Sequence, residues 1–411
     1  MLQTASMPVD HRVPDGVHSW IRLAVCMLIG TIGGVGMWSM VVVLPAVQAD
    51  FGVLRADVSL AFTLNMVGFG IGNVVIGRYL DRLGITLPLM VASLVLGSGY
   101  ILSSFTQSIL IFSILQVLVG MGASCSFGPV LADISHWFER RRGIAIAAVA
   151  AANYVAGAIW PGIIDAIVSA SDWRTAFQVI GIICILLIGP LAMLLRAKPP
   201  VTRSANLDQP RMVSSLSPRA LQIILAIAGI ACCVAMAMPQ LHIVAYCVDL
   251  GFGAGTGAEM LSLMLVGGLI SRLGFGLLAD RIGGVKTVLI SSGLQCLSLI
   301  LYIPYDGLAS LYVVSLIFGL SQGGIVSTYA IIIREYLPAN EAGQRVGLVI
   351  LATVCGMALG GWMSGWIYDL TGSYRIAFLN GIGWNVLNLA MMLLILFRTG
   401  QTGANLGRLP A

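Results

Sequence analysis

Long apolar segments, without regular alternation of polar positions, dominate the hydrophobic pattern of this chain. An α-helix rises ~1.5 Å per residue, so about 20 apolar residues cross a hydrocarbon core of roughly 30 Å. Membrane-spanning strands would show alternating hydrophobicity instead. We therefore expect an all-α membrane protein with twelve transmembrane helices, over 22–44, 58–76, 87–105, 108–133, 143–167, 174–196, 219–246, 258–279, 287–303, 309–333, 346–368 and 376–397.

A short polar turn occurs twice, half a chain apart. The sequence GRYLDRLG at 77–84 is echoed 199 residues later by GLLADRIG at 276–283. A second echo relates DWRTAF at 172–177 to SYRIAF at 373–378, with an offset of 201. Repetition of this kind is typical of membrane transporters built from two similar halves. We expect two six-helix bundles related by pseudo-symmetry.

The repeat predicts three regions along the chain. These are an N-terminal bundle over 1–196, a cytoplasmic linker over 197–218 and a C-terminal bundle over 219–411. The linker is polar, basic and rich in Pro and Ser, which suits a flexible connection. No Gly-x-x-x-x-Gly-Lys-Ser/Thr phosphate loop occurs, so we expect a gradient, and not a nucleotide, to supply the energy. We expect neither an enzyme nor a cofactor. The eight cysteines lack metal-site spacing, and we expect them to be packing residues rather than metal ligands.

Composition and charge add the orientation. The chain is 58% hydrophobic and 9% charged, whereas soluble domains are about 25% charged. Eighteen basic residues lie in the two tails and in the loops after even-numbered spans, against three on the other side, Arg55, Arg174 and Arg375. This positive-inside bias predicts that both termini are cytoplasmic. We expect a multi-pass monomer in the cell (inner) membrane, whose charge of +5 reflects topology and not nucleic-acid binding.

The repeated Gly-x-x-x-Asp-Arg-x-Gly turn resembles the signature loop of the major facilitator superfamily. The stretch DGVHSW at 15–20 resembles the entry to helix 1 of its monocarboxylate-transporter-like members. WFERRRGIA at 137–145 is similar to their entry to helix 5, and Arg272 matches the arginine that they carry in helix 8. Oxalate–formate exchangers resemble this branch as well. The resemblance implies the two-bundle fold and transport of small organic anions.

Several positions depart from these relatives. The first span has no lysine, although the animal monocarboxylate transporters carry one there. Gly268 occupies the place of an aspartate that some of them pair with the helix-8 arginine. The span 346–368 lacks the second cation of oxalate–formate exchangers, and Gln116 replaces the helix-4 arginine of drug–proton antiporters.

Arg272 is the one formal charge deep within an expected span. It precedes Asp280 by eight residues, which places it about 12 Å from the cytoplasmic end at ~1.5 Å per residue. A charge there costs roughly 3 kcal/mol unless it faces a cavity or a partner. A guanidinium binds a carboxylate through two parallel hydrogen bonds, so we expect Arg272 to anchor an anionic substrate. The structural alternative is an arginine that snorkels to the interface or binds backbone carbonyls.

Four further polar residues are candidates for the same pocket. Asn153 and Tyr154 lie about 15 Å along the fifth span from its basic entrance. Tyr329 lies in the tenth span, and His242 follows Pro239 in the seventh. A histidine titrates near neutral pH and could carry a proton. For each residue, the alternative is an interhelical hydrogen bond or simple packing.

Charges at the repeated turns suggest a gate. Asp81 and Arg82, together with Asp280 and Arg281, lie at helix ends, and Asp133 lies close to a further basic cluster. We expect these residues to hold the two halves together on the cytoplasmic face while the cavity opens outward. The alternative is that they only set the topology.

The expected function is secondary active transport of a small organic anion. A monocarboxylate moved together with H⁺ by alternating access fits best, because one buried cation matches one carboxylate. The alternative is an organic-anion exchanger, or a drug or metabolite efflux carrier of the same superfamily.

Overall fold

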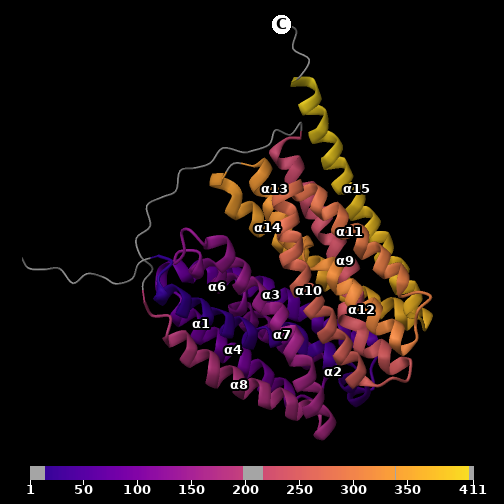
Figure 1. Ribbon diagram of the computed structural model, residues 1–411. Helices are drawn as coiled ribbons and strands as arrows, with labels where there is room; N and C mark the ends of the chain where they lie inside the picture. The colour runs from indigo at the N-terminus through magenta and orange to yellow at the C-terminus, as the bar shows by residue number, and fades with distance from the viewer. Residues whose placement is uncertain (1–13, 198–215, 338, 407–411) are drawn as a thin grey trace, which may run out of the picture.

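The computed structural model of the chain describes residues 14–197, 216–337 and 339–406, and its regular elements within these ranges are all helical (Figure 1). In chain order the helices are α1 Val17–Gly33, α2 Val35–Phe51, α3 Arg55–Leu83, α4 Thr86–Ser104, α5 Ile109–Ala123, the 3₁₀ turn η1 Ser124–Ser126, α6 Gly128–Ile134, α7 Arg142–Ala170, α8 Trp173–Met193, α9 Pro218–Asp249, α10 Ala254–Ile282, α11 Gly284–Leu301, α12 Leu308–Gln322, α13 Ile325–Tyr336, α14 Ala339–Thr371 and α15 Tyr374–Leu406.

The described helices form twelve spans that are long and apolar enough to cross a membrane, which confirms the expected all-α membrane fold. Three spans consist of two helices each, namely α1 with α2, α5 with α6, and α12 with α13. Many helices run past their expected ends; α14, for example, begins at Ala339 and not at 346. Hydrophobicity marks the part of a helix that lies in hydrocarbon, whereas the helix itself continues through the polar interface.

Close helix contacts repeat with the same period as the turns. A Cβ atom on Gly120 would lie 1.9 Å from the carbonyl oxygen of Asn65, and one on Gly319 would lie 2.1 Å from that of Met264. Each residue of the second pair follows its counterpart by 199 positions. Glycine allows backbones to approach this closely. The packing of α3 on α5 is therefore reproduced by the packing of α10 on α12.

The fourth and tenth spans are interrupted at equivalent places. α5 passes into η1 at Ser124, and α12 ends before Gly323 and Gly324. A Cβ atom on Gly323 would lie 2.0 Å from the carbonyl oxygen of Gly268 and 3.0 Å from the backbone nitrogen of Arg272. The interruption of the tenth span thus lies against the turn of α10 that carries Arg272.

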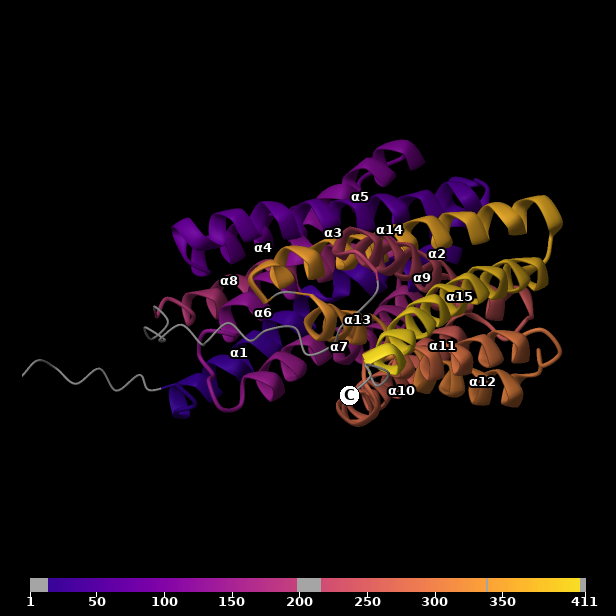
Figure 2. The ribbon, with the colours of Figure 1, turned by 90° about the horizontal axis from the view of Figure 1, so that it is seen from above.

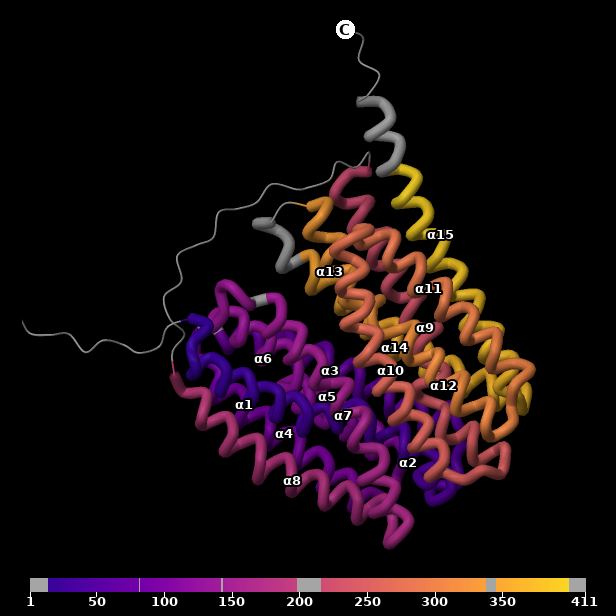
Figure 3. Tube along the Cα trace, in the orientation of Figure 1, coloured from indigo at the N-terminus to yellow at the C-terminus, as the bar shows by residue number. Residues whose placement is uncertain are grey.

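The two halves of the chain lie side by side, with α1–α8 in indigo to magenta and α9–α15 in red to yellow (Figures 1 and 2). They meet where α3 packs on α14, α7 on α10 and α2 on α9. We call the end of the molecule at which α1 and α9 begin the terminal end. The end at which α3 and α15 begin is the opposite end. Figure 3 traces the chain as it passes from one end to the other. Most of the expected linker lies outside the described residues, so the division into 1–196 and 219–411 stays a prediction.

The stretches 15–20 and 137–145, which resemble the entries to helices 1 and 5 of monocarboxylate-transporter-like proteins, contact each other at the terminal end. Asp15 has a left-handed backbone, with φ of 62°. Its carboxylate accepts hydrogen bonds of 2.9–3.1 Å from the N–H groups of Glu139, Arg140 and Arg141. Slight desolvation raises the pKa of this carboxyl, but the backbone donors outweigh it and hold the pKa below its ordinary value. Asp15 therefore fastens the start of the first span to the loop before α7.

Asp133, expected among the gating charges, lies in a buried ion pair instead. Arg22 Nε and Nη2 each donate to its carboxylate at 2.7 Å, and the two side chains are 2% and 8% exposed. Arg22 also donates to the carbonyl oxygens of Leu195 and Ala197, and its guanidinium lies 4.4 Å from the centre of the Trp137 ring. All these partners of Arg22 lie before residue 198, and so they belong to the same half of the chain as Arg22. In this conformation Asp133 joins helices of one half and does not bridge the two halves.

Candidate functional site

Arg272 lies on α10 at the contact between the two halves. Its side chain is partly buried, its Nη1 is 3.5 Å from the carbonyl oxygen of Ala150 on α7, and its Cζ is 5.4 Å from the centre of the Tyr154 ring. The backbone contact is at the limit of a hydrogen bond. Among the described side chains, no carboxylate forms an ion pair with this guanidinium. The charge is therefore held at the interface with one backbone contact from the described residues and no described counter-charge.

Tyr154 reaches this position because α10 has a glycine one turn before Arg272. A Cβ atom on Gly268 would lie 2.6 Å from Cε1 and 2.9 Å from Cδ1 of the tyrosine ring. The ring thus lies directly against the backbone of the opposite half. A cation over an aromatic face is attracted by the ring quadrupole. The departure at Gly268 therefore replaces a possible acidic partner of Arg272 with an uncharged aromatic ring.

Asn153 lies next to Tyr154 but turns toward the first span. Its carbonyl oxygen accepts a hydrogen bond of 3.1 Å from Trp38 Nε1. Its side-chain Oδ1 is buried and has no hydrogen-bond partner within the described structure. A Cβ atom on Gly34, where α1 passes into α2, would lie 3.5 Å from this oxygen. An unpaired buried acceptor beside a helix break is unusual and marks a position that water or a ligand could complete.

Gln322, a polar residue of the tenth span that the sequence also offers as a pocket candidate, lies close to the same region and pairs with Gln240, which the sequence did not indicate. Gln240 Nε2 donates to Gln322 Oε1 at 2.7 Å, and both residues are buried. Gln322 Nε2 has no partner among the described atoms. Gln322 ends α12 immediately before Gly323, which contacts the backbone of Arg272. Gln240 also lies within an apolar span, but its separation of 82 residues from Gln322 hides the pairing in the sequence.

Tyr329 is not brought together with Arg272 in this structure. Its side chain is 1% exposed, and its hydroxyl accepts a hydrogen bond of 2.6 Å from Asn388 Nδ2. Asn388 also donates to the carbonyl oxygen of Ala228 and accepts from Ser292. These residues belong to α13, α15, α9 and α11, so Tyr329 lies in an interhelical network inside the C-terminal half. An interhelical hydrogen bond was the alternative considered for Tyr329.

A cluster at the opposite end joins the two halves. Arg55, at the start of α3, donates from Nη1 and Nη2 to the Asp249 carboxylate at 2.5 and 3.2 Å, and from Nη1 to the Tyr374 hydroxyl at 2.9 Å. Its guanidinium also lies 4.2 Å from the centre of the Tyr368 ring. The Asp369 carboxylate accepts from the first two N–H groups of α3. In the sequence, Arg55 looked like an ordinary charge at the end of a span.

His242 belongs to this cluster and not to the surroundings of Arg272. It is fully buried in α9. Its Nδ1 is 3.1 Å from the Tyr374 hydroxyl, and its Nε2 is 2.9 Å from the carbonyl oxygen of Gly361. Both ring nitrogens therefore have partners, and one partner is the tyrosine that also binds Arg55.

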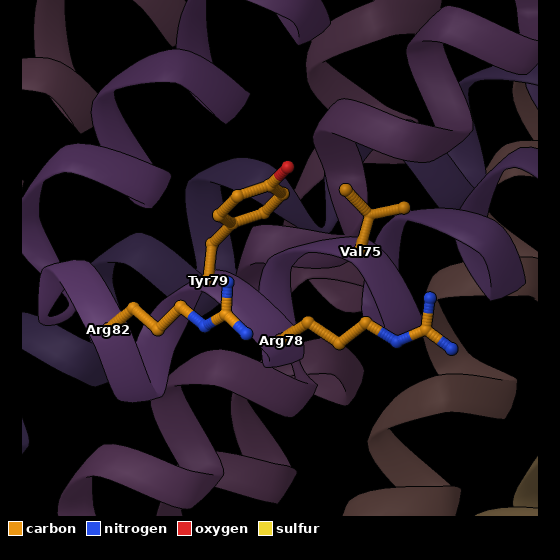
Figure 4. Close-up of a pocket in the computed structure, with 4 residues that line it drawn as sticks. All are labelled: Val75, Arg78, Tyr79 and Arg82. Atoms are coloured by element: carbon orange, nitrogen blue, oxygen red, sulfur yellow. The ribbon is translucent and has the colours of Figure 1, made fainter.

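The other expected gating residues lie at the terminal end. Arg82, Asp280 and Arg281 are exposed, and the side chain of Asp81 is outside the described part of the structure. Arg82 and Arg78 line an open pocket of about 480 Å³ on α3 together with Val75 and Tyr79 (Figure 4). The described hydrogen bonds between the halves start instead from Arg55, Ala56, Thr63 and Arg272. They lie between the middle of the bundle and the opposite end.

Comparisons with known proteins agree with this architecture. The family model described as Major Facilitator Superfamily matches residues 26–274 and 223–410. The chain is 25% identical to human monocarboxylate transporter 11 over 92% of this chain and 83% of that protein. It is 26% identical to the transporter asaE of Aspergillus flavus over 58% of this chain, and this match spans about half, 54%, of the fungal protein.

Solved structures share the fold at low sequence identity. A bacterial homologue of the human lysosomal transporter Spinster, in an inward-facing and occupied conformation, superimposes with a TM-score of 0.75 at 13% identity, covering 92% of this chain and 97% of that chain. The nucleoside transporter NupG gives a TM-score of 0.71 at 9% identity, covering 92% and 99%. These likenesses concern the arrangement of the helices.

Proposed function

Because this chain belongs to the Major Facilitator Superfamily, a family of membrane transporters and not of enzymes, we propose that it moves a small organic anion across the membrane. A monocarboxylate carried together with a proton is the proposed substrate. The monocarboxylate transporter that matches 92% of the chain supports this substrate class.

The guanidinium of Arg272 is the observation that carries the proposal. It lies between the two halves, partly buried, and no described carboxylate neutralises it. A cation in the membrane is retained where it has a function, because its insertion costs roughly 3 kcal/mol. A carboxylate can occupy both arms of a guanidinium. One such cation matches the charge of a monocarboxylate.

Alternating access is the proposed mechanism. The excess of basic residues near the terminal end supports a cytoplasmic location for that end and for both termini, in the cell membrane. The opposite end then faces outward. The contacts of Arg55, Asp249, Asp369 and Tyr374 join the halves there, so this conformation has its outer end closed. Transport requires this cluster to separate while the cytoplasmic end closes.

Transport assays in proteoliposomes test the proposed function. Uptake of labelled small monocarboxylates should be saturable, should exceed uptake of neutral or cationic analogues, and should increase with an inward proton gradient. Uptake that ignores the pH gradient but requires a counter-anion inside would indicate an exchanger. Absence of carboxylate binding, together with export of larger compounds, would favour the efflux alternative.

A double variant, Asp81→Asn with Asp280→Asn, tests the proposed cytoplasmic gate. Uptake should fall by several fold while the amount of inserted protein stays unchanged, because the carboxylates at the two repeated turns would bind across the halves when that end closes. The measurement is initial uptake rate normalised to folded protein from size-exclusion chromatography. Unchanged uptake would mean that these turns only set the topology.

Gly268→Ala tests whether Arg272 depends on the position of Tyr154. The new methyl group would lie 2.6 Å from the ring, and overpacking costs about 1–3 kcal/mol. We expect a lower melting temperature and weaker anion binding. Residues in contact show coupled effects, so Gly268→Ala should destabilise a Tyr154→Ala background much less than it destabilises the parent. Additive effects on melting temperature would contradict the proposed packing.

A further inference from the structure

The hydrogen bonds around His242 define which of its nitrogens carries a proton. The carbonyl oxygen of Gly361 can only accept, so the contact of 2.9 Å requires a hydrogen on Nε2. The guanidinium of Arg55 can only donate, so the Tyr374 oxygen accepts from it at 2.9 Å. The hydroxyl hydrogen of Tyr374 is then free to point to His242 Nδ1, 3.1 Å away. The hydrogen bonds therefore run in one direction, from Arg55 to Tyr374, from Tyr374 to His242 and from His242 to the carbonyl oxygen of Gly361.

This arrangement accommodates neutral histidine and opposes the protonated form. A second proton on Nδ1 would direct a donor at the Tyr374 oxygen, which already accepts from Arg55. The tyrosine hydroxyl hydrogen would lose its acceptor, and two cations would flank one hydroxyl at a site where His242 is fully buried. Unpaired polar groups and unpaired charges are both costly in such surroundings.

The other charged and titratable groups near His242 are already engaged. On its own helix, Asp249 binds Arg55, and the Tyr246 ring packs 5.4 Å from that of Tyr374. The elements packed against α9 contribute the following groups: Tyr368 and Asp369 of α14, which contact Arg55; Arg375 of α15, which pairs with Asp306; Asp50 of α2, which pairs with Arg174; and Glu259 of α10, which accepts from Tyr312. None of these carboxylates has a described hydrogen bond to the imidazole.

We propose that His242 is a proton-binding site that controls the outer end of the transporter. The closed outer end holds the neutral imidazole, and a proton taken up on Nδ1 favours separation of Arg55 and Tyr374. When the end closes again, Nδ1 releases its proton and regains the hydrogen bond from Tyr374. The proposal rests on the outward orientation of this end in the proposed function, and it identifies a place where protons act on the transport cycle.

The expected size of the effect follows from linkage. A ligand that binds one of two states shifts their ratio by the factor 1 + [L]/Kd. If only the open form accepts the proton, the ratio of open to closed molecules rises up to about tenfold per pH unit below the midpoint of the histidine in the open form. An exposed histidine has a pKa near 6.5, so the response should fall between about pH 5 and 8.

Distance measurements without substrate test the proposal. Spin labels on Ser171→Cys and Gly307→Cys report the separation of the halves at the opposite end, since both positions are exposed there. Cys296 and Cys355, the cysteines that are not buried, are replaced by serine in this background. Between pH 8 and pH 5.5, the population with the longer distance should grow in the parent.

His242→Gln should abolish this response, because glutamine does not titrate. His136→Gln is the matched control, since His136 is exposed at the other end, and it should leave the response intact. If His242→Gln fails to fold, Tyr374→Phe serves instead. Loss of the hydroxyl removes the hydrogen bond that favours the neutral imidazole, so opening should then occur at higher pH.

Two results would overturn the proposal: a pH response that persists in His242→Gln, or a parent whose distances do not change with pH. Carboxylate binding is measured separately on the same preparations. A parent that opens with acid but binds no carboxylate would refute the proposed substrate and leave the proton site standing. A parent that binds carboxylate without pH-dependent opening would refute the proton site and leave the proposed substrate standing.

Discussion

Replacing Arg272 with alanine is expected to abolish carboxylate binding, and replacing it with lysine should restore binding only in part. Lysine retains the charge, and with it the cost of insertion, but it lacks the planar pair of donors. A hydrogen bond to a charged group contributes about 1.5–3 kcal/mol, so loss of one arm should weaken affinity by roughly ten- to a hundredfold. Calorimetry or competitive uptake measures this affinity, with size-exclusion profiles as the check on folding.

Two controls isolate the effect of the anchor. Arg219→Ala removes an exposed arginine at the start of α9 in the same half, and it should leave the affinity unchanged. A neutral analogue without the carboxylate should bind the parent no better than it binds Arg272→Ala. If Arg272→Ala binds the anion as tightly as the parent, the guanidinium is a structural residue held by Ala150 and Tyr154, and the proposed site is wrong.

Asp133→Asn is expected to destabilise the protein strongly, by about 3–5 kcal/mol, because it breaks a buried ion pair and leaves one charge without its partner. The Arg22 side chain is 2% exposed, and its guanidinium donates two hydrogen bonds of 2.7 Å to the Asp133 carboxylate. The carbonyl groups of Leu195 and Ala197 that also bind it cannot neutralise its charge. The measurement is thermal unfolding and the yield of monodisperse protein in detergent.

A compensated pair separates a structural from a gating function. Arg22→Met combined with Asp133→Leu removes both charges, and it should recover a large part of the stability that Asp133→Asn loses, because apolar residues often replace buried pairs at little cost. Asp280→Asn is the control for stability alone, since that carboxylate is exposed and its loss should leave thermal unfolding unchanged. Normal folding of Asp133→Asn with slowed transport alone would support the original expectation of a gate.

The sequence alone determined the spans, their number and the internal repeat. These features are linear, because about 20 apolar residues are needed to cross the bilayer wherever they occur in a chain. The 199-residue offset of the two turns also relates equivalent helix contacts in the two halves. Gly120 approaches Asn65 in the first half as Gly319 approaches Met264 in the second. Arg272 stood out for the same reason, since a charge within an apolar run is visible without any knowledge of its neighbours.

The partners of polar residues were decided by the tertiary structure. Asp133 is 111 positions from Arg22, and Asp249 is 194 positions from Arg55. Tyr329 contacts Asn388 inside one half, and His242 contacts Tyr374 at the opposite end instead of Arg272. Hydrophobic pattern reports how deep a residue lies along its helix, but not the direction in which its side chain points.

That direction depends on how the helices pack, and small residues control the packing. Gly268 allows the Tyr154 ring to reach the backbone beside Arg272, and Gly323 brings the end of α12 against the same turn. In lipid, helices associate through such close contacts and through interhelical hydrogen bonds, not through burial of apolar surface from water. The sequence therefore predicted which residues lie within the membrane, whereas shape complementarity among its helices determined which of them meet.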